Sequence, residues 1–76
     1  MKEIKHFFEK IGRSDVDETI DNLVEDGVID SIEIMNLIQE METYYGVFID
    51  FDYINPEHLR NFQAIKNMIE EILKNN

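Results

Sequence analysis

The stretch that decides this fold is Gly27-Val28-Ile29-Asp30-Ser31-Ile32-Glu33-Ile34-Met35, where a loop ends and an amphipathic pattern begins. Asp30 suits the N-cap position, because its carboxylate can accept hydrogen bonds from the free N–H groups of the first helical turn. Glu33 follows three residues later, which completes a capping-box pattern and places negative charge at the positive end of the helix dipole. Ser31 is then the first helical residue, with its hydroxyl expected to face water.

The helix that begins here is predicted to run from residue 31 to Tyr45 and to stop at Gly46. Its core face is expected to carry apolar side chains at helical spacing, namely Ile34, Leu37, Ile38, Met41 and Tyr45. The opposite side is expected to carry the polar residues Glu33, Asn36, Glu40 and Thr43. Ile32 and Met35 fall on the flank beside Ser31, and methionine suits an adaptable contact surface.

The rest of the chain predicts two more main helices and one short one. Residues 2–11 form the first, ended by Gly12, with a buried stripe of Ile4, Phe7, Phe8 and Ile11. Asn55-Pro56 predicts a short helix through about Arg60, with Asn55 as N-cap and proline in the first turn. Asn61 can cap the last helix, whose buried stripe is Phe62, Ile65, Met68, Ile69 and Ile72; the tail 74–76 should fray.

Two connections join these helices. Residues 14–30 form a long first loop, which is uncommon in a small domain and often functional, with a possible helical turn at 19–24. Residues 47–54 alternate like a strand, but no second strand exists to pair with them, so an extended loop is expected. The sequence therefore predicts an all-α fold in one domain, residues 1–76: a small four-helix bundle of three main helices and one short helix.

The composition limits the function. The net charge of −10 argues against binding to nucleic acid or to anionic membranes, because the acidic surface would repel their phosphates. No apolar run approaches the roughly 20 residues of a membrane span, and no signal peptide is recognised, so a cytoplasmic monomer without membrane insertion is expected. No Lys or Arg stands between Ser14 and Leu59, where thirteen carboxylates fall. This acidic block is either a solvated face or a docking surface for basic partners.

Intrinsic catalysis has little support in the sequence. There is no cysteine, and His6 and His58 stand at no recognisable distance from each other or from a nucleophile, so no metal site and no catalytic residues are expected. Ser31 lacks a nucleophile-elbow pattern, and three glycines form no phosphate-binding loop. An acidic loop beginning at Asp15-Val16-Asp17 fails as a calcium loop, since Thr19 and Ile20 take the next ligand and glycine positions.

The chain resembles an acyl carrier protein over essentially its whole length. The likeness rests on Asp26-Gly27-Val28-Ile29-Asp30-Ser31-Ile32, on Leu37-Ile38-Gln39-Glu40-Met41-Glu42, and on the following Tyr45-Gly46-Val47. The approach to Ser31 looks closer to D-alanine-type or specialised stand-alone carriers than to the fatty-acid type. Asn36 and Gln39 stand where fatty-acid carriers usually place an acidic and an apolar residue.

This resemblance implies an acyl-carrier-protein-like bundle in which Ser31 carries 4′-phosphopantetheine, transferred from coenzyme A by a separate phosphopantetheinyl transferase. Asp30 matches the aspartate that precedes the family serine. The docking face would comprise Ile32, Glu33, Met35 and Glu40. It would meet basic patches on the transferase, on an acyl- or aminoacyl-loading ligase and on downstream acyl-transfer enzymes. The alternative is an acidic helical protein-interaction module without a prosthetic group, in which Ser31 belongs only to the helix start.

Overall fold

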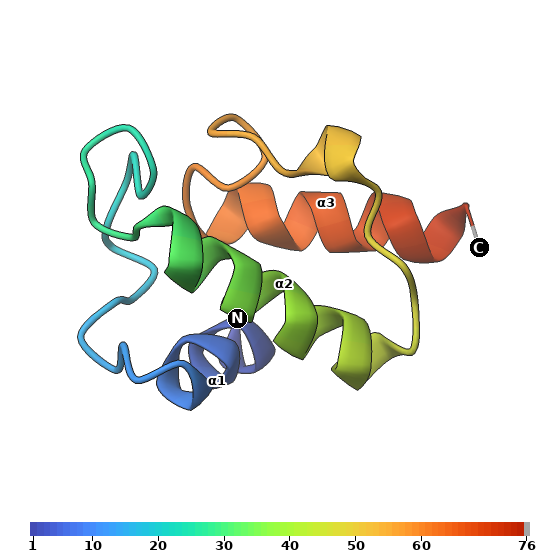
Figure 1. Cartoon of the computed structure of the whole chain (residues 1–76), viewed down its shortest axis with the longest axis horizontal. Coiled ribbons are helices and arrows are strands. Elements are labelled where there is room, and N and C mark those ends of the chain that lie inside the picture. Colours follow the sequence, from blue (N-terminus) through green and yellow to red (C-terminus); the bar gives the residue numbers. More distant parts are fainter. Residues whose placement is uncertain (76) are drawn as a thin grey trace.

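Three helices carry the fold in the computed structural model, which describes residues 1–75. They are α1 (Lys2–Lys10), α2 (Ser31–Tyr45) and α3 (Phe62–Lys74), and a 3₁₀ helix, η1 (Phe51–Tyr53), precedes α3. No strand forms within those 75 residues. α1 packs against both α2 and α3, and η1 lies beside α3 (Figure 1). The predicted small helical bundle and its three main helices are confirmed.

The core draws on one face of each helix, as the apolar stripes predicted. α1 contributes Ile4, Phe7 and Phe8, while α2 contributes Leu37, Ile38 and Met41, with Ile34 and Tyr45 packed at its edge. All five predicted residues of α3 are buried. The rings of Phe8 and Phe62 stack with centroids 5.2 Å apart, which fastens α1 to α3. Among the described residues, no polar or charged side chain is buried.

The long first loop is held by its own apolar residues. Val16, Leu23 and Ile29 are buried in the same core. The expected helical turn lies slightly later than predicted, since the Asp26 N–H donates to the Asn22 carbonyl at 2.9 Å. The loop therefore approaches α2 along a fixed path, although most of it has no regular secondary structure.

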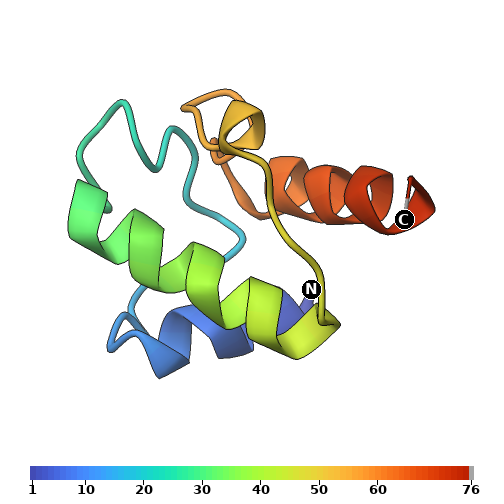
Figure 2. The ribbon, with the colours of Figure 1, turned by 45° about the vertical axis from the view of Figure 1, so that its right-hand side comes forward.

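The second connection corrects one prediction. Gly46 ends α2 in the left-handed conformation, with φ of 65°, and Figure 2 shows the chain then running extended to η1. The short helix expected from Asn55 to Arg60 is wrong: only one turn forms, in which the Leu59 N–H donates to the Asn55 carbonyl at 3.1 Å. Asn55 does cap it, accepting from the His58 N–H at 2.9 Å.

The turn is followed directly by Asn61, which has an extended backbone and is the N-cap of α3. The Arg60 carbonyl accepts the Leu23 N–H of the first loop at 2.8 Å, and Leu59 is buried in the core, so the turn is held against that loop. The 3₁₀ turn forms instead at residues 51–53, inside the segment predicted to be extended, where the Asp50 side chain accepts the Asp52 N–H at 2.9 Å. At the C-terminus, the predicted fraying of the tail 74–76 is wrong for Lys74, which is the last residue of α3, and Asn75 is its C-cap. Asn76 lies outside the described residues.

Candidate functional site

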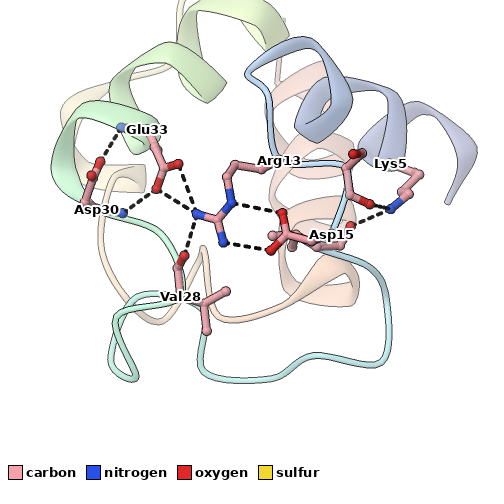
Figure 3. Close-up of polar contacts among 8 residues, drawn as sticks. Lys5, Arg13, Asp15, Val28, Asp30 and Glu33 are labelled. Atoms are coloured by element: carbon pink, nitrogen blue, oxygen red, sulfur yellow. Dashed lines mark hydrogen bonds and ion pairs between the residues drawn. The ribbon is translucent and has the colours of Figure 1, made fainter.

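The start of α2 is a complete capping box, as predicted. Asp30 has an extended backbone, and its carboxylate accepts the Glu33 N–H at 2.8 Å. The Glu33 carboxylate reaches back and accepts the Asp30 N–H at 3.0 Å (Figure 3). Two of the donors that a helix start leaves free are thereby satisfied reciprocally, which fixes the position of the first turn.

Ser31 is the first residue of this helix, and it is exposed. The N–H groups of Glu33 and Ile34 are taken by the side chain and the carbonyl of Asp30. The N–H groups of Ser31 and Ile32 come before the first intrahelical hydrogen bond and so stay at the open, positive end of the helix. A negative group attached to the Ser31 hydroxyl would therefore lie where the helix favours an anion.

Two large apolar side chains lie beside Ser31. Ile32 is 71% exposed and Met35 is 52% exposed, and helical spacing places them next to each other on the surface of α2. They contribute nothing to the core. The structure thus brings together the serine and the apolar flank that the sequence predicted.

An arginine that the sequence analysis did not single out connects this site to α1. Arg13 Nη1 donates to both Glu33 carboxylate oxygens, at 2.9 and 3.0 Å, and to the Val28 carbonyl at 2.7 Å. Its Nε and Nη2 donate to Asp15 at 3.0 and 3.1 Å. Figure 3 shows the guanidinium between the two carboxylates, with Lys5 on the far side of Asp15. Lys5 Nζ donates to the Val16 carbonyl at 2.8 Å.

The charges of this cluster are mutually stabilised. The hydrogen bonds to Asp15 and then to Glu33 raise the pKa of Arg13 above its ordinary value, and the hydrogen bond from Arg13 lowers the pKa of Asp15. The sequence offered one signal for the contacts of Arg13 with Asp15 and Glu33: Arg13 is the last basic residue before the acidic block.

The two acidic residues predicted for partner docking lie in different surroundings from Ile32 and Met35. The Glu33 side chain is only 23% exposed, and its carboxylate already accepts hydrogen bonds from Arg13 and from the Asp30 N–H. Glu40 is half-buried in a shallow groove toward α1, which Lys10 and Thr43 also line. Glu33 therefore builds the site, and partner contact by either residue stays a prediction.

In the part of the chain that the structure describes, neither histidine forms a hydrogen bond with the residues around Ser31 and Arg13. His6 lies on α1, with its Nδ1 3.9 Å from Glu9 Oε1. His58 Nδ1 is 3.0 Å from the Asn55 side-chain oxygen, and the His58 ring packs against Tyr53. Within residues 1–75, no three acidic or histidine side chains converge as a metal site. None of the helices in that range combines the length and apolar character that a membrane crossing requires.

Comparison with known proteins gave no match to this chain among protein-family models, curated proteins or solved structures. Functional assignment therefore depends on the chain's own residues and geometry. The feature that stands out is an exposed serine on a fixed helix start with exposed apolar neighbours.

Proposed function

We propose that this chain is a carrier protein of the acyl carrier type, with 4′-phosphopantetheine attached to Ser31. The observation that carries the proposal is the exposure of Ser31 at the first position of a fully capped helix, beside exposed Ile32 and Met35. The order of elements, with a long loop before α2 and a short turn before α3, agrees with that plan.

The residues at Ser31 fit such a group. A phosphodiester there would receive the helix dipole and the free N–H groups of Ser31 and Ile32. Asp30 and Glu33 would oppose it, but the Asp30 carboxylate accepts the Glu33 N–H and the charge of Glu33 is offset in part by Arg13, which also pairs with Asp15. The bound arm would supply the thiol that holds an acyl or aminoacyl group as a thioester.

The chain's own contribution is to hold and present that arm rather than to catalyse. Arg13 fixes the end of the first loop against α2 through Val28 and Glu33, so Ser31 stands at a fixed place. Ile32 and Met35 provide an apolar contact, and the acidic block raises the rate of encounter with basic partners while leaving release easy. The proposed partners are a phosphopantetheinyl transferase, a loading ligase and acyl-transfer enzymes, met by a cytoplasmic monomer.

The decisive experiment is modification in vitro. Incubation with coenzyme A, magnesium and a promiscuous phosphopantetheinyl transferase should add the mass of one phosphopantetheinyl group. Ser31→Ala should abolish the gain, and Ser14→Ala is the matched control because Ser14 is the only other serine and is also exposed. Modification at another residue, or none with several transferases, would overturn the proposal.

The exposure of Ile32 favours one alternative function, an acidic interaction module that needs no prosthetic group. In that case Ser31→Ala would leave partner binding unchanged, whereas Ile32→Ala or Met35→Ala would weaken it. The modification experiment distinguishes the two proposals, because only a carrier protein would gain the mass of a phosphopantetheinyl group.

A further inference from the structure

Two phenylalanines after α2 are held out of the core. Phe48 is 78% exposed and Phe51 is 77% exposed, although Ile49 between them is buried. At about 200 Å² per phenylalanine side chain, the pair presents about 300 Å² of apolar surface. The largest apolar patch on a typical monomer covers about 300–600 Å² and is often functional, and the combined area of the two rings lies at the lower end of that range.

The backbone that carries these rings is fixed by hydrogen bonds on both sides. The Ile49 N–H donates to the Glu42 side chain at 2.8 Å, which ties the segment to α2. The Asp52 N–H donates to the Asp50 carboxylate at 2.9 Å and closes the turn that holds Phe51. Phe48 and Phe51 are therefore presented by an ordered segment, which reduces the entropy that a partner would have to remove on binding.

The electrostatic surroundings indicate what binds there. Asp50 and Asp52 are exposed and flank Phe51 in the sequence, and the sequence has no Lys or Arg from residue 14 to residue 59. The nearest basic residue along the chain, Arg60, is paired with Asp21 at 2.9 Å. A second copy of this chain, with a net charge of −10, and an anionic membrane would both be repelled.

We propose that Phe48 and Phe51, bordered by Asp50 and Asp52, form a docking surface for a partner protein whose apolar pocket is edged by Lys or Arg. This aromatic surface follows the C-terminal end of α2, and Ser31 begins the helix. The 15 residues of α2 separate the two ends of that helix by about 22 Å at 1.5 Å per residue. Docking at the aromatic surface does not require Ser31 to be modified.

A labelled amphipathic helical peptide with one leucine face and one lysine face is a suitable probe. Titrated into the ¹⁵N-labelled chain, it should shift amide resonances of residues 47–53 more than those around Ser31. Phe48→Ser combined with Phe51→Ser should weaken binding about tenfold or more, while Phe48→Leu with Phe51→Leu should retain most of it. Thermal melting of each variant verifies that the fold is intact.

Charge controls complete the test. Asp50→Asn with Asp52→Asn should weaken binding more than Glu25→Gln with Asp26→Asn, which changes the net charge equally at exposed positions of the first loop. Asparagine at position 50 keeps the capping oxygen. Equal binding of wild type and the double serine variant, or shifts centred on Ser31, would overturn the proposal. So would self-association, or binding to phosphatidylglycerol vesicles, that depends on the two phenylalanines.

Discussion

Replacement of Asp30 tests whether the capping box fixes the start of α2. In Asp30→Ala, the hydrogen bond from the Glu33 N–H at 2.8 Å is lost, whereas the reciprocal bond survives because its donor is the backbone N–H of residue 30. Loss of a helix N-cap costs about 1 kcal/mol. For 76 residues, an unfolding entropy of about 2.1 cal/mol/K per residue converts this cost to a fall of about 6 °C in Tm.

Asp30→Asn is the matched control for this measurement. Asparagine removes the same charge but keeps a side-chain oxygen, and it caps helices about as well as aspartate. Thermal unfolding followed by circular dichroism should therefore give a much smaller fall for Asp30→Asn than for Asp30→Ala. Equal falls would show that charge, and not the hydrogen bond, matters at this position. No fall in either variant would refute the argument that the capping box stabilises α2.

The same pair separates structure from recognition at the proposed modification site. If the transferase reads the carboxylate that precedes Ser31, Asp30→Asn should be folded but modified more slowly than the wild type. Modification at the wild-type rate would limit Asp30 to its structural role as an N-cap.

Three further predictions concern charges. The hydrogen bond from Arg60 is the main cause that lowers the pKa of Asp21 to about 2. The stabilisation from this pair is thus present above the ordinary value of 3.8 and lost as the pH falls through about 2; in an NMR titration, Arg60→Gln should return the midpoint toward 3.8, and an unchanged midpoint would contradict the pairing. Arg13→Gln should lower Tm and speed amide hydrogen exchange at residues 28–33, because Glu33 and the Val28 carbonyl lose their donor. Exchange at the wild-type rates would contradict the view that Arg13 holds the first loop against α2. Added salt should raise Tm by screening the net charge of −10, and a Tm indifferent to salt would argue that self-repulsion is negligible.

The parts of the fold that the sequence predicted are those set by local signals. The stripe of α3 and its Asn61 cap are contained within a few successive turns, and the cap is present, with Asn61 accepting the Ala64 N–H at 2.8 Å. The capping box of α2 is likewise a relation between residues three apart. Such signals act within one helix, so they can be read without knowing the rest of the fold.

The parts that it missed depend on residues far apart in the chain. The turn at residues 55–60 is held against the first loop by the hydrogen bond from the Leu23 N–H to the Arg60 carbonyl, a contact that no local pattern contains. Arg13 and Glu33 are 20 residues apart, so the sequence could not show that one carboxylate of the acidic block was already paired. The bonds of Glu33 to Arg13 and to the Asp30 N–H were therefore not visible in the sequence, and contact of Glu33 with a partner stays a prediction.

The local charge at Ser31 matters more for the proposed carrier function than the net charge of −10. A chain so acidic should repel a phosphodiester, yet both carboxylates in the capping box beside Ser31 accept hydrogen bonds: Asp30 from the Glu33 N–H, and Glu33 from Arg13, which it shares with Asp15. The N–H groups of Ser31 and Ile32 remain at the positive helix end. In the proposed carrier, these N–H groups would favour the phosphodiester while the acidic block would attract basic partners. The ion pair between Arg13 and Glu33 would serve both requirements, since without it the negative charge of Glu33 would lie unpaired within the first turn of the helix that would hold the arm.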